Sequence, residues 1–447
     1  MVLGGERASG LENALRGYLL EQARLCIRAP VGRFHHPWFA PMPASTATAQ
    51  HLRGEASDKA VQHTDPRSSD GFLVGDYSLG LSSHDASESS IELLRHSELR
   101  DAAVGSLLSL LECAGPDGCI HRIELPHHTR DAEPSRPVMA QYALRVVRAL
   151  GDKGPDWAEQ HRALEGVVRF MRFLEQHYVG LHGLFLTHSS RQSGFDSDIL
   201  TAGMPPKSVE GPDTNALMVL EYRALGELCR TLSRSDAEWE EKATRLRERI
   251  EALLWRDEAD AGYYVGLRGD HRSAAEADEV VGFLGADRKL RPCQSWTGLL
   301  PLYAGIPSPQ RASRLIREMT DPAGYWGPWG VRTAPADDVF FHQARRVMVY
   351  DERRNQRSPV SNWSGPVWVL SNYYLARGLA LYGESARASE LTLKTVRLLA
   401  NGLAQQGQLH ECYDDLGRGL WPDQGTFISW NLLALTLLDE MSAQPAG

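Results

Sequence analysis

Two acid-bearing loops hold the side chains best suited to proton transfer. The segment RQSGFDSDI (residues 191–199) carries Asp196 and Asp198 between two helical regions, and QLHECYDDLGRG (residues 408–419) carries Glu411 just before the last apolar helix. Carboxyl groups can act as general acids or bases. Acids in loops are also commonly solvated or cap a helix, so neither loop alone decides between these uses.

Other reaction chemistries have little support in the sequence. His35–His36 and His127–His128 are adjacent pairs. Adjacent residues do not share a helix face, and no HxxxH motif with an acidic partner is present, so we expect no metal site. There is no GxxxxGK[ST], no strand-flanked GxGxxG and no GxSxG. We therefore expect no cofactor and no serine nucleophile.

Aromatic residues are a second candidate feature. The chain has 11 Trp, whose ring faces can stack on the C–H faces of sugars, although packing in a core is their commoner use. In GYWGPWG (residues 324–330), Trp326 and Trp329 stand in a Gly- and Pro-rich loop. Exposing two such rings is unfavourable, so we expect them to pack on a substrate or on the rim of the fold.

The elements that must position these residues are mostly helical. Apolar residues recur at helical spacing in eleven segments. The predicted helices are 9–28, 87–113, 136–150, 156–178, 213–232, 235–256, 294–304, 308–319, 365–383, 384–406 and 425–443. Some segments are charged and amphipathic, such as 235–256, whereas 365–383 is apolar or uncharged nearly all round. This alternation predicts two concentric helical layers, an all-α (α/α)6 barrel of about six hairpins. No fixed short repeat favours a solenoid.

Long helix-poor segments are expected around the active-site mouth. We expect one catalytic domain over residues 1–447, with long loops at 29–86, 181–212 and 320–363. Long ordered loops in compact domains are often functional. The polar stretch 44–70 is either such a loop or a mobile excursion.

The composition excludes several partners. The net charge is −9, with 42% hydrophobic and 23% charged residues. An acidic globular chain is not expected to bind nucleic acid or an anionic membrane. No run of about 18 apolar residues predicts a membrane span, and no basic-then-apolar leader is present, so we expect a cytoplasmic protein. The oligomeric state is left open.

A set of ordered motifs identifies a resemblance. NWSGPVWVLSNYYLARGL (362–379) resembles the N-W-x-G-P-V-W…N-Y…G-L signature of clan G α/α-barrel glycosidases, and LLPLYAGI (299–306) resembles their L-P-L-x-A-G-I stretch. SGFDS (193–197) resembles their acid loop, HECYDDLGRG (410–419) resembles their base loop, and FISWNLLALTLL (427–438) resembles their terminal helix. The motifs keep the order of that group from about residue 70 onward. The chain thus resembles glycoside hydrolase family 63, including its bacterial mannosylglycerate and glucosylglycerate hydrolases.

The resemblance implies an inverting hydrolysis with two carboxyl groups. It makes Asp196 the general acid, which needs a raised pKa, and Glu411 the general base that activates a water. In this mechanism the two carboxyls stand roughly 6.5–9.5 Å apart. Asp198 is then an exposed helper or a bystander.

The same resemblance suggests sugar-binding residues. Trp363 and Trp368 would line the sugar pocket, with packing in the core as the alternative. Gly365, with Pro366, would form the turn into the following helix. Asn362 would bind a sugar hydroxyl or cap that helix.

The N-terminal half departs from the family pattern. In SSHDASESSIELL (82–94), Asp85 takes the position of a hydroxyl-binding Asp or caps a helix that begins near Ala86, and His84 replaces a Trp. Loss of that ring weakens stacking, but His84 could offer a hydrogen bond. Arg136 lies in a locally basic segment and would suit an anionic aglycone, unless the segment forms a salt-bridge cluster on the surface.

These observations favour an inverting glycoside hydrolase that cleaves a small α-glucoside or α-mannoside, such as glucosylglycerate or mannosylglycerate. Its partner would be a small sugar substrate. One alternative is a sugar isomerase or epimerase on the same barrel, which would need paired histidines instead of Asp196 and Glu411. Another is a non-catalytic carbohydrate-binding descendant.

Overall fold

A computed structural model describes most of the chain. The described residues are 5–44, 80–127, 133–202, 204–257, 262–269, 280–284, 290–292, 294–339, 341, 349–351, 356–358, 363–421 and 425–443. The expectation for the polar stretch 44–70 concerns residues that, apart from Ala44, lie outside these ranges, and so does Asn362.

Six helical elements form a closed inner ring, in which each contacts the next and the last contacts the first. They are α5 (Ser83–Leu93), α7 (Met139–Ala149), α11 (Pro212–Thr231), the 3-10 helix η2 (Trp296–Leu302), α14 (Val369–Leu381) and α16 (Leu433–Ala443). Most side chains of α5, α11 and α14 are buried. These elements are enclosed because ring neighbours cover their sides and a second helix covers their outer face.

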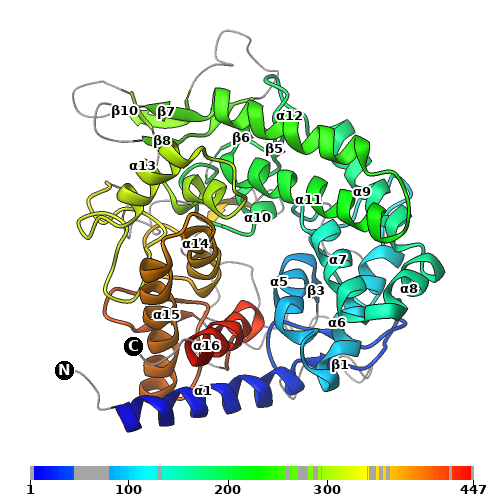
Figure 1. The fold of residues 1–447 in the computed structure, drawn as a ribbon, viewed down its shortest axis with the longest axis horizontal. Coiled ribbons are helices and arrows are strands. Elements are labelled where there is room, and N and C mark those ends of the chain that lie inside the picture. The colour runs from blue at the N-terminus through cyan, green and yellow to red at the C-terminus, as the bar shows by residue number, and fades with distance from the viewer. Residues whose placement is uncertain are drawn as a thin grey trace.

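The outer layer supplies that second helix. Its members are α1 (Gly5–Leu25), α6 (Ser97–Glu112), α9 (Ala163–His177), α12 (Ala237–Leu253), α13 (Pro309–Met319) and α15 (Ser385–Gln406). Each packs against one or two inner elements, and inner and outer elements alternate along the chain. Figure 1 shows this arrangement, with α1 lying along one edge next to α15 and α16. The predicted all-α (α/α)6 barrel is confirmed.

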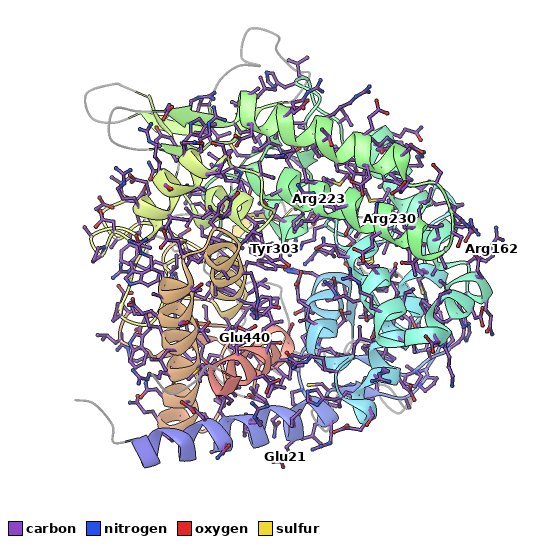
Figure 2. All side chains as sticks on the ribbon, viewed as in Figure 1. Glu21, Arg162, Arg223, Arg230, Tyr303 and Glu440 are labelled. Carbon is purple, nitrogen blue, oxygen red and sulfur yellow. The ribbon has the colours of Figure 1, made fainter. Side chains whose placement is uncertain are left out.

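Side-chain placement follows the two layers. Glu21 on α1 and Arg162 before α9 are exposed and lie at the edge of the molecule (Figure 2). Tyr303 follows η2 and packs against Tyr374 of α14, with ring centroids 4.5 Å apart.

Among the described helices, none combines the length and apolar character needed to cross a bilayer.

Three of the predicted helices are each divided. The segment 425–443 begins only at Ser429 and consists of the 3-10 helix η3 (Ser429–Leu432) followed by α16. The segment 87–113 contains a break between α5 and α6 at residues 94–96. The segment 156–178 is divided into α8 (Gly154–Gln160) and α9, because Arg162 between them takes a left-handed φ of 51°. Neither break is marked by Pro or Gly, so the apolar periodicity runs through both.

Two other predicted helices begin or wind differently. The segment 294–304 is a 3-10 helix with Pro301 inside it, which removes a backbone donor. In 365–383 the helix begins only at Val369, since Gly365 has a φ of +131° and Pro366 follows it. This turn matches the expectation for Gly365.

Short antiparallel strands and small helices connect the layers. The pairs are β1 (Ile27–Arg28) with β2 (Trp38–Phe39), β3 (Leu81–Ser82) with β4 (Ile123–Glu124), β7 (Trp255–Asp257) with β8 (Gly262–Tyr264), β10 (Gly282–Leu284) with β11 (Leu290–Pro292), β12 (Val349–Asp351) with β13 (Gln356–Ser358), and β14 (Cys412–Tyr413) with β15 (Gly419–Trp421). One sheet has the order β5 (Leu186–Thr187), β6 (Val209–Glu210), β9 (Leu267–Arg268). The remaining short helices are η1 (Gly151–Lys153), α10 (Ser190–Ser193) and η3 (Ser429–Leu432).

Candidate active site

The acid loop is built by a single turn of helix followed by a glycine. Ser189 caps α10 by accepting a hydrogen bond from the Gln192 N–H at 3.1 Å. Gly194 ends α10 with a φ of +80°, a conformation that costs glycine little. A Cβ at this position would lie 2.3 Å from Nδ1 of His84. The loop can therefore approach α5 closely, and it leaves Asp196 buried.

Residues 363 and 364 bind the acid loop directly. The Trp363 N–H donates to Oγ of Ser197 at 2.7 Å, and the Ser364 hydroxyl donates to the Ser197 carbonyl at 2.7 Å. The Gly365 N–H donates to the Thr333 hydroxyl at 3.0 Å. The block that precedes α14 is thus fixed against the acid loop on one side and against the segment near Thr333 on the other.

The base loop is attached to the same block. Val367 and Tyr413 exchange backbone hydrogen bonds of 2.8 and 3.0 Å, which places β14 beside the start of α14. The His410 N–H donates to the Tyr413 hydroxyl at 2.9 Å, and Asn431 donates to the His410 carbonyl at 2.8 Å. Glu411 is held between these anchors and is 2% exposed.

Three carboxyl groups meet in this buried region: Asp85, Asp196 and Glu411, called here the carboxyl cluster. Burial, and then the charges of Asp196 and Asp85, raise the pKa of Glu411 well above its usual range. Burial also raises the pKa of Asp85, although hydrogen bonds from Ser429 and Ser82 and the nearby Arg122 oppose this shift. Like charges that are close and desolvated disfavour full ionisation, so the cluster retains a proton more readily than isolated carboxyls would.

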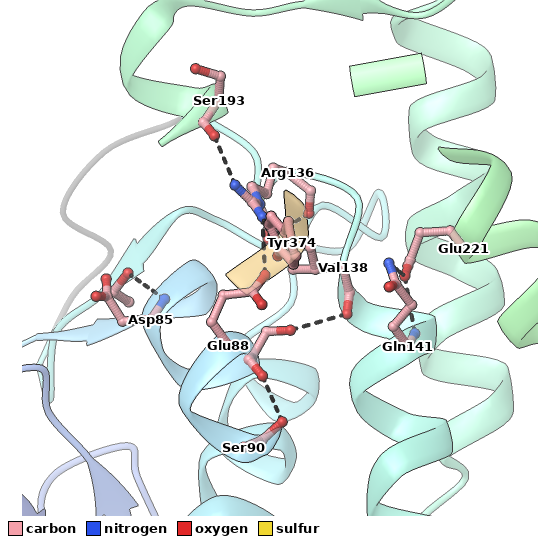
Figure 3. Close-up of polar contacts among 12 residues, drawn as sticks. Asp85, Glu88, Ser90, Arg136, Val138, Gln141, Ser193, Glu221 and Tyr374 are labelled. Atoms are coloured by element: carbon pink, nitrogen blue, oxygen red, sulfur yellow. Dashed lines mark hydrogen bonds and ion pairs between the residues drawn. The ribbon is translucent and has the colours of Figure 1, made fainter. Parts of the chain in front are cut away.

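Asp85 lies in the first turn of α5, as Figure 3 shows. The cap of α5 is Ser82, whose hydroxyl accepts from the Asp85 N–H at 3.3 Å. The alternative in which Asp85 caps a helix beginning near Ala86 is therefore wrong. The Asp85 carboxyl instead accepts a hydrogen bond from the Ser429 hydroxyl.

An aromatic cluster adjoins the carboxyl cluster. Its members are His84, Phe195, Trp296, Trp363, Trp368, Phe427 and Trp430, all of them buried. Trp363 stacks on Trp368 with centroids 3.7 Å apart and on Trp296 at 5.4 Å. Because His84 and Phe195 directly precede Asp85 and Asp196 in the chain, the aromatic rings and the carboxyls share one site.

Several ring nitrogens in the aromatic cluster have no hydrogen-bond partner among the residues that the structure describes. They are Nε2 of His84 and Nε1 of Trp296, Trp363 and Trp430. Buried polar atoms are almost always paired, and each exception in a structure needs an explanation. Burial, followed by the charges of Arg136 and Arg122, lowers the pKa of His84 well below its usual range, which favours the neutral ring. These atoms are suited to bind the hydroxyls of a small polar ligand.

Arg136 connects three parts of the site (Figure 3). One terminal nitrogen donates to the Ser193 carbonyl at 3.2 Å, and the other donates to Glu88 and to the Tyr374 hydroxyl, both at 3.0 Å. The guanidinium also lies over the Phe195 ring at 5.1 Å. Arg136 is 2% exposed, so the alternative of a surface salt-bridge cluster is wrong for this residue.

Replacing Arg136 with Met is expected to destabilise the fold by about 3–5 kcal/mol, because it leaves Glu88 as an unpaired buried charge. Urea unfolding would measure the change. The double variant Arg136→Met/Glu88→Leu should recover much of this loss, since an apolar pair replaces the ion pair. If Arg136→Met unfolds at the wild-type urea concentration, Glu88 does not depend on this partner.

The two loop tryptophans occupy different places. Nε1 of Trp326 donates to Glu390 at 3.2 Å, and Lys394 lies over its ring at 4.5 Å, so Trp326 packs on the outer helix α15. This is the rim position expected as one option, and it separates Trp326 from the aromatic cluster. Trp329 is half-buried and packs over Gly417, which lies within the base loop.

Asp198 differs from its expectation as an exposed residue. It is 1% exposed and accepts hydrogen bonds from the Ser295 hydroxyl, the Thr297 hydroxyl at 3.3 Å and the Leu200 N–H at 2.9 Å. Burial, with the charge of Asp213 adding to it, raises the pKa of Asp198 to about 7. The alternative of an exposed helper is therefore wrong, because polar partners far along the chain, at 295 and 297, enclose this carboxyl; the bystander alternative stays a prediction.

Trp296 and Trp430 are members of the site that motif reasoning missed. Trp296 stands three residues before LLPLYAGI, and Trp430 lies within FISWNLLALTLL. Both segments were recognised, but only as apolar elements. Among the described residues, no group of three His, Cys, Asp or Glu side chains is arranged to hold a metal ion.

The sequence matches a known family. A family model described as the mannosylglycerate hydrolase MGH1-like glycoside hydrolase domain matches residues 94–421. A mannosylglycerate hydrolase of Rubrobacter radiotolerans is 27% identical over 187 residues, which are 41% of this chain and 35% of that protein. One from Thermus thermophilus is 29% identical over 223 residues, 48% of this chain and 42% of that protein. The matches therefore span less than half of these relatives.

Solved structures share the fold. A family 63 mannosylglycerate hydrolase of Thermus thermophilus, in complex with glucose, superposes with a TM-score of 0.65 at 21% identity, covering 95% of this chain and all of that one. Neutral trehalase Nth1 of Saccharomyces cerevisiae has a TM-score of 0.57 at 14% identity, covering 83% of this chain and 73% of the trehalase.

Proposed function

The chain belongs to the mannosylglycerate hydrolase MGH1-like glycoside hydrolase family, and from this premise we propose that it is an inverting glycosidase. Its substrate would be a small α-mannoside or α-glucoside, with mannosylglycerate and glucosylglycerate as the first candidates. The names of its relatives support the mannosylglycerate option. We also propose that residues 1–447 form one catalytic domain, which is supported by the closed helical ring.

The observation that carries the proposal is the meeting of two distant acidic loops. Asp196 and Glu411 belong to separate segments, yet the charge of Asp196 contributes to the raised pKa of Glu411. In an inverting reaction, Asp196 would protonate the departing glycosidic oxygen. Glu411 would take a proton from the water that attacks the anomeric carbon from the other face of the ring.

The carboxyl cluster supplies the proton that such a reaction consumes at the leaving group. Glu411 must be ionised when water attacks, and Asp196 must be protonated. Because the three carboxyl groups interact, they titrate together, and a proton bound by the carboxyl cluster cannot be assigned to one residue. A substrate hydroxyl that hydrogen-bonds to Asp85 would help to shift the shared proton toward Asp196.

The sugar would be held by the aromatic cluster. We propose Trp363 and Trp368 as ring-stacking residues of the pocket wall, and Asp85 and His84 as partners of sugar hydroxyls. The unpartnered Nε2 of His84 supports the last role. Gly365 would set the turn that presents Trp363, while Asn362 remains a proposed ligand outside the described residues, and Trp329 a residue of the mouth.

For Arg136 we propose a positioning role instead of contact with an anionic aglycone. Its two terminal nitrogens are already engaged by Glu88, Tyr374 and the Ser193 carbonyl. Within the described part of the chain, Nε of Arg136 has no hydrogen-bond partner. The tie to Ser193 supports an action through the acid loop.

A panel of α-glycosides tests the proposal. Mannosylglycerate, glucosylglycerate, kojibiose, nigerose and trehalose would be incubated with the enzyme, and the first-formed sugar anomer would be observed by NMR. We expect the β-anomer from one of the glycerate glycosides, because water attacks opposite to the α-linked leaving group. First-formed α-anomer would exclude inversion.

The same panel addresses the alternatives. An epimerase would change the sugar without releasing an aglycone, and it would need a pair of histidines at the barrel mouth. His84 lies in the aromatic cluster, whereas the His410 ring packs edge-on against Tyr413. A non-catalytic binding protein would show ligand-dependent thermal stabilisation by panel members without product.

A further inference from the structure

The acid loop makes a second set of anchoring contacts, on the side of η2. Asp198, two residues after Asp196, accepts hydrogen bonds from the hydroxyls of both Ser295 and Thr297 on one carboxylate oxygen. Its other oxygen accepts from the Leu200 N–H at 2.9 Å, within the loop. One side chain therefore closes the turn of the acid loop and joins that loop to the start of an inner-ring element.

The two hydroxyl donors flank Trp296. Ser295 also caps η2, because its hydroxyl oxygen accepts from the Thr297 N–H at 3.2 Å. Trp296 is fully buried and packs edge-on against Phe195 at 4.6 Å. Phe195 directly precedes Asp196, and Asp198 follows two residues later. The segment 295–297 therefore contacts the acid loop both before and after Asp196.

These contacts indicate that the Asp198 side chain holds the acid loop in place and is not a solvated surface acid. Asp198 and the neighbouring Asp213 are both buried, and their proximity disfavours ionisation of both. Among the described residues, the hydrogen-bond donors to Asp198 are neutral: two hydroxyls and one backbone N–H. Burying a carboxyl group in this environment lowers the stability of the fold. In exchange, its hydrogen bonds fix the conformation of the loop that carries the proposed acid.

We propose that Asp198 is a positioning residue of the general acid, which acts through Ser295 and Thr297 by fixing Trp296 and Phe195 around Asp196. This inference rests on the proposed function. It concerns leaving-group protonation, because the contacts of Asp198 lie on the η2 side of the acid loop, whereas the base loop is held through Val367 and Tyr413 at the block before α14. Loss of Asp198 should therefore impair the acid and leave the base intact.

Leaving-group dependence separates these two steps. A glycosidic oxygen must be protonated as the C–O bond breaks, whereas an α-glycosyl fluoride loses fluoride with its electron pair and needs little help from an acid. Attack by water and transfer of its proton to Glu411 are the same for both substrates. The ratio of the two rates thus reports on the acid alone.

The experiment compares Asp198→Ala with the wild type on the glycerate glycoside that the panel identifies and on the corresponding α-glycosyl fluoride. We expect kcat on the glycoside to fall roughly 10- to 100-fold, the scale of a displaced catalytic group, with the rate on the fluoride nearly unchanged. The variant Ser295→Ala/Thr297→Val, which removes the donors and keeps Asp198, should show the same selective loss. Combining all three changes should add little, because they break one set of contacts.

Glu221→Ala is the matched control. Glu221 is another fully buried carboxylate, but it accepts from the Ala140 and Gln141 N–H groups at the start of α7. It should lower the unfolding temperature without changing the ratio of the two rates. If the Asp198 variants lose the same fraction of the rate on both substrates, or lose none on either, the positioning role of Asp198 is wrong, but the proposed function still stands. If the wild type hydrolyses neither substrate, the proposed function fails and this inference fails with it.

Discussion

Glu411→Gln is expected to lower hydrolysis of the glycoside by about 10²–10⁴-fold, the usual contribution of a general base. The same variant should be equally impaired on the α-glycosyl fluoride, since attack by water still needs a base. Asp196→Asn should lose the glycoside to a similar extent but retain much of its rate on the fluoride. This contrast between the two variants, measured as initial rates, assigns acid and base separately.

The Glu411 variant should not lose stability. A carboxyl whose pKa is raised on folding binds more protons in the folded than in the unfolded state, so the stability of the wild type falls as pH rises between the two pKa values. Gln removes this dependence, because it does not titrate. We expect Glu411→Gln to unfold at a higher urea concentration than the wild type near neutral pH, with a smaller difference in acid.

A matched control keeps that result interpretable. Glu221→Gln changes another buried carboxyl group, one that accepts hydrogen bonds from backbone N–H groups of α7 and whose pKa burial also raises. By the same linkage it should raise stability near neutral pH, while leaving turnover unchanged. Both variants should then gain stability near neutral pH, but only Glu411→Gln should lose turnover. Wild-type turnover by Glu411→Gln would contradict the role of this residue as the base.

The sequence predicts the inner and outer helical layers well, because the packing of each helix determines how its apolar and charged residues are distributed. The charged face of 235–256 and the uncharged surface of 365–383 reflect one helix that meets solvent and one that does not, and they became α12 and α14. The breaks at residues 94–96 and at Arg162 were missed. A helix can end where tertiary contacts favour a turn, and no local residue has to mark that position.

The candidate site was predictable only in part, for a related reason. Motifs carry local information, and they identified the acid loop, the base loop and the block before α14. They could not indicate that residues 295 and 297 would enclose Asp198, or that Glu88 and Tyr374 would engage Arg136. Burial of a charged group depends on partners that the chain brings together only after the ring closes.

Gly194→Ala is the second substitution expected to have a large effect, and it acts without removing any functional group. The φ of +80° is strained for alanine by roughly 1–3 kcal/mol. The added methyl would also stand 2.3 Å from Nδ1 of His84, so the acid loop or α5 must shift. Because a displacement of about 1 Å can cost two orders of magnitude in rate, we expect turnover of the glycoside to fall about 100-fold in a protein that still folds.

Gly407→Ala separates the backbone contribution from the displacement of the site. Gly407 ends α15 with a φ of +71°, and a Cβ there would meet nothing within 4 Å. It should lower the unfolding temperature by an amount similar to the backbone part of the Gly194 change, while kcat stays at the wild-type value.

If Gly194→Ala also keeps full turnover, the acid loop tolerates movement against His84, and close contact between these two elements is not required for catalysis. If both variants lose activity in proportion to stability, the loss reflects unfolding. Only a selective loss in Gly194→Ala supports a catalytic role for the geometry of this loop.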